Sequence, residues 1–201
     1  MADITDVGDA IVQVIALIAY PSGISQPSMT GAPIVIYQGW PNDQQLPIDL
    51  KAGMVHVSVF PRPNDKVSSV TMGSDWVEIS NDGKSGIALA EIRRQTRTYQ
   101  ITVWANNFSI RDPVASALDS ALAMVTRLTL PDGTKGILAY VNSAQNDDEQ
   151  KIGIYRRDLF YSVNYATTLN QSYKTILEAD SNVTVAAVGN LEIGRFNVTN
   201  H

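Results

Sequence analysis

Few side chains in this sequence are suited to catalysis. The 201 residues include two histidines and no cysteine. A hydrolase needs a nucleophile, a base and a group that orients the base. His56 is the internal histidine, and it alternates with Val55 and Val57 in a predicted strand. A structural histidine explains this pattern better than a catalytic one, so we expect no catalytic residue and no enzyme activity.

Three consecutive acids, Asp147, Asp148 and Glu149, are the candidate ligands for a cation. Three neighbouring side chains cannot all point inward, and the glycine and distant glutamate of a calcium-binding loop are not present. The absence of cysteine excludes disulfides and thiolate metal sites. The chain also has no glycine-rich phosphate-binding loop. We therefore predict a solvated acidic loop, no metal and no cofactor.

Two groups of arginines invite comparison with a phosphate site. One contains Arg93, Arg94 and Arg97, and the other is the pair at positions 156 and 157. Both groups are interleaved with strand residues and lie close to an acid, Glu91 in the first case and Asp158 in the second. Salt bridges between subunits explain them more economically than phosphate binding.

The tryptophans Trp40, Trp76 and Trp104 lack the basic neighbours that base-stacking platforms use. Packing in a core or an interface is the favoured interpretation. A carbohydrate-binding module remains as a remote alternative, with Trp40 or Trp76 acting alongside Asp75 and Glu78. It is disfavoured because Asp75 and Trp76 are adjacent in a predicted strand and so point to opposite faces.

Charge is scarce in this chain. Hydrophobic residues make up 44% and charged residues 17%, with a formal net charge of −5. A soluble monomer usually carries more charge, so we expect part of the surface to contact other subunits. The negative balance offers no general attraction to nucleic-acid phosphates. The apolar run at 11–20 is too short to span a bilayer and follows acidic residues, which predicts a soluble cytoplasmic product without a membrane partner.

The first half of the chain predicts one helix followed by strands. Apolar residues spaced along one stripe indicate a helix over 4–19, capped by Asp3. The Ser-, Gly- and Pro-rich stretch after it has loop composition and is a candidate contact arm. The expected strands span 33–38, 54–60, 76–80, 86–94 and 97–105, with loops at 40–49 and 81–86. Trp104 lies on the more polar face of its strand, so we expect another segment to cover it.

The second half predicts a helix and two further strands. Asp112 followed by Pro113 is a typical helix start, and the apolar spacing carries this helix to about residue 128. Strands are expected at 137–141 and 152–166, joined by an acidic loop. The second of these strands alternates cleanly, with Leu159, Tyr161 and Val163 on one face, and is expected to be central.

This order of elements predicts an α+β fold, an antiparallel or mixed β-sheet with helices packed on one face, plus a C-terminal extension. We divide the chain into a domain at 1–169 and an extension or arm at 170–201. The extension starts with a short helical pattern and continues with β-branched residues. It can fold back as a hairpin or add a strand to a neighbour's sheet edge.

Three segments together carry a resemblance to a known family: RTYQITVWANNFSIRDPVASALDSAL, then LPDGTKG, then IYRRDLFYSVNYATT. This succession, which spans roughly the middle half, resembles tail terminator and tail completion proteins of long-tailed bacteriophages. The resemblance implies an α+β structural virion protein that forms a hexameric ring at the head-proximal end of the tail tube. Such a ring stops tube polymerisation and provides the docking face for the head-neck complex.

The resemblance also implies partners and a location. The partners are further copies of the chain, the tail tube protein, a neck or head-completion protein and, where the tail is contractile, the sheath protein. DNA would pass through the lumen without specific binding, and the virion would be assembled in the host cytoplasm. The expected lumen-facing loop holds Asp147, Asp148 and Glu149. The expected ring contacts are Arg111, Asp112, Arg156, Arg157 and Asp158.

The chain departs from the family pattern in two places, the long region at 21–84 and the tail after residue 169. These additions leave another neck, head-completion or tail-tube structural protein as the alternative function.

Overall fold

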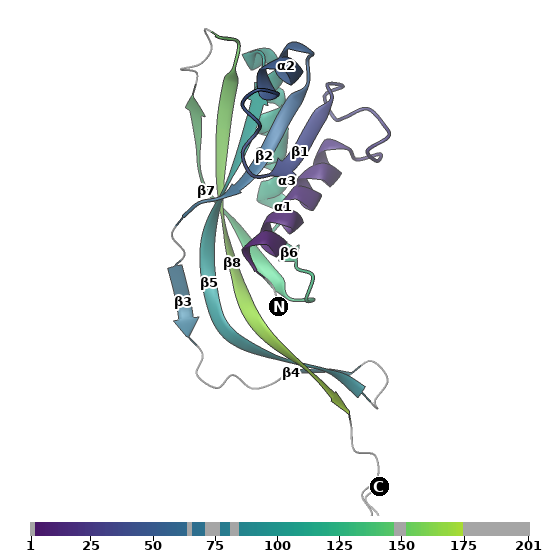
Figure 1. Ribbon diagram of the computed structural model, residues 1–201, viewed down its shortest axis with the longest axis vertical. Helices are drawn as coiled ribbons and strands as arrows, with labels where there is room; N and C mark the ends of the chain where they lie inside the picture. Colours follow the sequence, from purple (N-terminus) through teal and green to yellow (C-terminus); the bar gives the residue numbers. More distant parts are fainter. Residues whose placement is uncertain (1–2, 64–65, 71–76, 81–84, 147–151, 175–201) are drawn as a thin grey trace, which may run out of the picture.

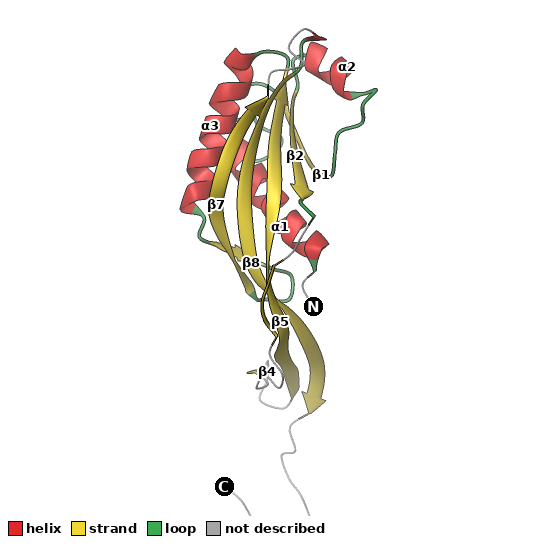
Figure 2. Ribbon diagram, turned by 90° about the vertical axis from the view of Figure 1, so that its left-hand side faces the viewer, coloured by secondary structure: helices red, strands yellow, loops and turns green. Residues whose placement is uncertain are grey.

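The computed structural model describes residues 3–63, 66–70, 77–80, 85–146 and 152–174. It is an α+β structure in which one curved, mixed β-sheet carries two long helices on a single face (Figures 1 and 2). The predicted fold class is therefore confirmed. No helix in the described part of the chain is long and apolar enough to cross a membrane.

Helix α1 (Ile4–Ala19) matches its predicted bounds and its predicted cap. The Asp3 carboxylate accepts from the backbone N–H groups of Thr5 and Asp6, and the Asp6 carboxylate accepts from the N–H of Asp3. This reciprocal capping satisfies donors that the first helical turn would otherwise leave open. The helix then buries Val7, Ile11 and Ile15 against the sheet.

The sheet contains eight strands in the described residues. They are β1 (Ile34–Gln38), β2 (Val55–Pro61), β3 (Lys66–Val70), β4 (Val77–Ser80), β5 (Ser85–Ala105), β6 (Arg127–Thr129), β7 (Lys135–Asn146) and β8 (Tyr155–Lys174). The main order is β1-β2-β5-β8-β7-β6, and β3 and β4 also pair with β5. Among the described strands, β1 and β2 run parallel and the other pairs are antiparallel. Strand β8 is central, as predicted.

Strand β5 is one continuous strand where the sequence predicted two. Its pairing with β8 continues from Ser85 to Ala105, with a register shift between Glu91 and Arg93. A β-bulge accommodates an extra residue without ending a strand. Its partner β8 continues past Leu169 to Lys174. The first residues of the predicted extension, where the sequence has a short helical pattern, are therefore in a strand. Residues 175–201 of the predicted extension lie outside the described residues.

Helix α3 (Phe108–Met124) begins before the predicted start at Pro113 and ends before residue 128. Its N-cap is Asn107, whose side chain accepts from the N–H of Ile110 at 2.9 Å. The Asp112 cap was therefore wrong: an earlier cap satisfies the free N–H groups, and Pro113 lies inside the helix. Leu128, predicted as helical, is instead buried in β6.

The main core lies between the sheet and the two long helices. Tyr99, Ile101 and Val103 of β5 and Leu159, Tyr161 and Val163 of β8 all point into it and are fully buried. The predicted alternation of β8 is thus confirmed. The Tyr161 hydroxyl donates to Asp119 Oδ1 at 2.7 Å, which ties α3 to the central strand. Its burial and the Asp119 carboxylate raise the pKa of Tyr161.

A short helix, α2 (Leu46–Lys51), falls where the sequence predicted a loop. It buries Leu46 and Leu50 in a second cluster with Trp104 and Ile154. Trp104 is on the sheet face opposite α1 and α3, which we call the outer face. The prediction that another segment covers Trp104 is confirmed, because α2 covers it.

Candidate functional site

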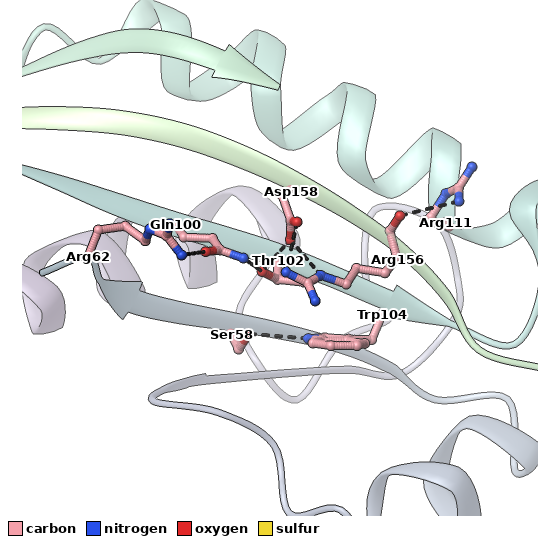
Figure 3. Close-up of polar contacts among 8 residues, drawn as sticks. All are labelled: Ser58, Arg62, Gln100, Thr102, Trp104, Arg111, Arg156 and Asp158. Atoms are coloured by element: carbon pink, nitrogen blue, oxygen red, sulfur yellow. Dashed lines mark hydrogen bonds and ion pairs between the residues drawn. The ribbon is translucent and has the colours of Figure 1, made fainter. Parts of the chain in front are cut away.

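The outer face carries a chain of polar side chains that we call the outer-face network (Figure 3). Its members come from the neighbouring strands β2, β5 and β8 and from the segment after β2. One branch consists of Ser58 and Trp104. The other branch consists of Arg62, Gln100, Thr102, Asp158 and Arg156. The paired registers of β2, β5 and β8 place these residues in adjacent rows.

The network is continuous from Arg62 to Arg156. Arg62 Nη1 donates to Gln100 Oε1 at 3.2 Å, and Gln100 Nε2 donates to Thr102 Oγ1 at 3.2 Å. Thr102 Oγ1 donates to Asp158 Oδ1 at 2.7 Å. Arg156 then holds both carboxylate oxygens of Asp158, with Nε at 3.0 Å from Oδ1 and Nη2 at 2.9 Å from Oδ2. Such a bidentate, charge-assisted pair fixes both side chains.

The guanidinium of Arg156 also contacts two aromatic rings. Its central carbon lies 5.0 Å from the ring centroid of Trp104 and 5.3 Å from that of Trp40. Trp40 packs in addition against Phe60, with ring centroids 5.3 Å apart. Both tryptophans interact favourably with the arginine cation. Trp40 therefore packs within the chain, as the sequence predicted for core or interface tryptophans, while Trp76 lies outside the described residues.

The outer face is drier than its sequence pattern predicted. Gln100 and Thr102 were expected on the solvated side of β5, yet both are 1% exposed. Burial without partners would be costly, and the network supplies a partner to each of them. Asp158 accepts its bonds from Thr102 and Arg156, with no histidine among these donors. This arrangement is suited to holding strands together rather than to proton transfer.

His56 forms a separate polar group on the outer face. Its Nδ1 lies 3.2 Å from the Tyr37 hydroxyl, and its Nε2 lies 3.2 Å from Asp49 Oδ2 on α2. Burial lowers the pKa of His56, and Asp49 partly opposes this shift. Burial also raises the pKa of Tyr37 to about 12. The neutral imidazole thus connects β1, β2 and α2, as a structural histidine would.

The predicted contact residues separate into buried and accessible ones. The Arg111 side chain is fully buried: its Nε donates to Asp112 Oδ1 at 2.8 Å and its Nη1 to the carbonyl of Arg156 at 3.4 Å. Asp112 itself is 43% exposed. Arg157 is half-buried and forms no ion pair within the described part of the chain.

The structure therefore brings Arg111, Asp112, Arg156 and Asp158 together around the start of α3 and β8. The acids at 147–149 lie outside the described residues. Among the other arginines, Arg94 pairs within the chain with Glu91, Nη2 to Oε2 at 2.6 Å. The described residues include no group of three or more acids or histidines placed to hold a metal ion.

Sequence reasoning missed four members of the outer-face network, namely Ser58, Arg62, Gln100 and Thr102. One signal was present: polar residues alternate at 100 and 102 on β5 and at 156 and 158 on β8. Two aligned runs of polar residues on one face indicate mutual pairing once the strands are known to be neighbours.

Comparison with solved structures finds several similar chains, among them the two that follow. No protein-family model matches the chain, and no curated protein matches it. One similar chain is from the virion of a native gene transfer agent particle, with 17% identity, a TM-score of 0.41, and coverage of 81% of this chain and 96% of that one.

The second similar chain is the sheath/tube terminator of an extracellular contractile injection system in its extended state. It has 16% identity and a TM-score of 0.48, covering 96% of this chain and 66% of that one. Because both TM-scores are below 0.5, neither likeness decides what this protein does.

Proposed function

We propose that the protein is a structural virion protein, a tail terminator that forms a hexameric ring. In this proposal the ring caps the tail tube and presents the docking face for the head-neck complex. Support comes from the resemblance of the segments within residues 97–168 to that family and from the shape of the subunit. The polar contacts of the outer face and of Tyr161 hold strands and helices together, which fits a protein that acts by shape.

The observation that carries this proposal is the long β5–β8 ribbon, which continues beyond the part of the sheet that α1 and α3 cover (Figures 1 and 2). Along it, Ile92 is 45% exposed and Leu169 50%, and Val67 of β3, which pairs with β5 there, is 54% exposed. A narrow ribbon cannot bury its own apolar side chains and is marginally stable alone in water. We infer that the ribbon rests on another subunit or on the tube.

The residues that we expect at the ring contacts fall into two groups according to how deeply they are buried. Asp112 and Arg157 are accessible and are proposed to face a neighbouring subunit. Arg111, Arg156 and Asp158 hold the beginning of α3 and the beginning of β8 in place, so they would support the contact from behind. The acids at 147–149 are proposed to line the lumen, where negative charge would keep passing DNA from binding.

The partners follow from the proposed position. They are the tail tube protein on one side, a neck or head-completion protein on the other, and the sheath protein where the tail is contractile. The virion is the proposed location, after assembly in the host cytoplasm.

A tube-length assay tests this function. Purified tube protein is allowed to polymerise with increasing amounts of this protein, and tube lengths are measured by electron microscopy. A terminator shortens tubes and is found at one end only. Incorporation along the whole tube, or long tubes formed by this protein alone, would instead identify a tube subunit.

A further inference from the structure

The sheet ends at two edges, and one of them is open over a long stretch. Strand β7 pairs with β8 along its length but with β6 only through Lys135, Gly136 and Ile137. From Ala139 to Ala144, no strand of the described chain lies on its outer side. At the opposite end of the sheet, β1 pairs with β2 alone.

The open stretch of β7 has little protection against pairing with another strand. Natural sheet edges commonly carry lysine or proline or are covered by another segment. Residues 139–144 include neither a charged residue nor a proline. Tyr140 is 51% exposed and Val141 49% exposed, and one register shift between Tyr140 and Asn142 is the main irregularity. This edge is suited to receive a strand.

Strand β1 offers a second, shorter open edge. The carbonyl of Pro33 accepts from Val55, and the N–H of Gly39 donates to Val59. The odd-numbered residues of β1 therefore bond to β2, and the backbone of Ile36 faces away from it. At Ile34 the outward backbone groups are already occupied, because the Tyr20 hydroxyl donates to its carbonyl and accepts from its N–H, each at 2.8 Å.

Backbone hydrogen bonds also identify the β7 residue whose N–H and carbonyl face away from β8. The N–H of Leu138 donates to the carbonyl of Thr126, on the side away from β8. Tyr140, two residues further along before the register shift, faces the same side. Its ring centroid lies 5.6 Å from that of Tyr161, whose hydroxyl bonds to α3, so the Tyr140 side chain is on the helix-covered face. Ile36 packs against the core on that face too.

The strand directions make these two edges complementary. β2 runs parallel to β1, and each further step through β5, β8 and β7 is antiparallel, so β7 runs opposite to β1. A rotation about an axis along the strands leaves strand directions unchanged. It therefore places β7 of one subunit antiparallel to β1 of the next, with the helices of both on the same side.

The geometry points to a contact between the open edge of β7 in one subunit and β1 of the next subunit, with Tyr140 opposite Ile36, and the Tyr20–Ile34 hydrogen bonds stop the pairing from extending to Ile34. Each of these two residues donates one backbone hydrogen bond to the other and accepts one. The contact joins different surfaces of the two copies, so it generates a ring when the rotation closes. This inference rests on the proposed ring function and adds the surfaces that join its subunits.

Disulfide crosslinking tests the contact, because the natural chain has no cysteine. The double variant Ile36→Cys/Tyr140→Cys is oxidised mildly and run on a non-reducing gel. We expect a ladder of covalent multimers and none from either single variant. Ile48→Cys/Tyr140→Cys is the matched control, because Ile48 is exposed on α2 on the outer face, whereas Ile36 and Tyr140 lie on the helix-covered face, and it should give no ladder.

A proline variant provides a second measurement. Tyr140→Pro removes the outward N–H, whereas Tyr140→Ala keeps it and loses the same ring. We expect Tyr140→Pro to lower the fraction of subunits in rings at least tenfold relative to Tyr140→Ala.

Dimers from Tyr140→Cys alone would show that two β7 edges pair with each other and would overturn the contact. Rings without an Ile36–Tyr140 crosslink would also overturn it and leave the terminator function standing, whereas wild-type protein that neither forms rings nor caps tubes would contradict the function itself.

Discussion

Arg156 and Asp158 lie two residues apart on the same face of β8 and bind each other, with Arg156 Nη2 2.9 Å from Asp158 Oδ2. The Asp158 side chain is 8% exposed and that of Arg156 27%. Sequence reasoning assigned both residues to contacts between subunits. Their pairing within the chain makes them first of all a brace between β5 and β8, because Asp158 also accepts from Thr102.

Replacing Asp158 by asparagine should destabilise the fold. The change leaves the arginine without its counter-charge and Thr102 with a weaker acceptor, at a cost of about 1–3 kcal/mol in the free energy of unfolding. Denaturant titration measures this loss. Arg157→Ala is the control on the same strand, where no ion pair is broken, and should cost less than about 1 kcal/mol. Equal losses in the two variants would contradict the proposed role of the pair.

The start of α3 can be tested with a pair of alanine substitutions. Asn107→Ala removes the side chain that accepts from Ile110 and should cost about 1 kcal/mol of stability. Ser109→Ala removes an exposed side chain of the same helical turn and leaves both the cap and the pair of Asp112 with the buried Arg111 intact, so its effect should be smaller. An equal or larger loss from Ser109→Ala, measured by thermal or chemical unfolding, would contradict the cap at Asn107.

His56 should make stability sensitive to mild acid. Burial lowers its pKa below the ordinary 6.5, so the folded chain binds a proton less readily than the unfolded chain. The contribution of His56 to the free energy of unfolding is therefore fully present above about pH 6.5 and is lost as the pH drops towards the lowered pKa. His56→Gln should lose less stability than wild type between pH 7.5 and 5. Identical losses would show that the imidazole contributes nothing to this dependence.

Charge reversal at Arg157 tests the proposed subunit contact. Arg157→Glu should reduce ring formation, because the side chain is accessible and forms no ion pair within the described part of its own chain. Arg127→Glu, on the exposed surface of β6, is the matched control and should form rings normally. Sedimentation velocity separates rings from monomers. Normal rings from Arg157→Glu would remove this residue from the contact and leave the terminator function untouched.

The sequence was sufficient for elements whose signals are local. The Asp3 cap and the apolar stripe defined α1, and strict alternation identified the core face of β8. Features that depend on contacts between distant residues could not be predicted from the sequence. Asp112 and Pro113 look like a helix start, but Asn107 provides an earlier cap, and the pairing of Gln95 and Thr96 with β8 joins two apparent strands into β5.

The site was predicted only in part for the same reason. The sequence singled out the charged residues at 111–112 and 156–158 but assigned them to contacts between subunits, whereas Arg111 pairs with Asp112 and Arg156 with Asp158 within the chain. Which partner each takes depends on strand register, because Thr102 meets Asp158 only when β5 and β8 are paired as they are. The burial of Gln100 likewise depends on neighbouring strands that lie far away in the sequence.

The most direct test of the proposed terminator is negative-stain electron microscopy of the purified protein, alone and mixed with tail tubes from the same source. The proposal predicts discrete rings of subunits, or added density that caps one end of each tube, with six-fold symmetry in end views. Monomers that leave both tube ends bare, under conditions where the tubes themselves are intact, would contradict it.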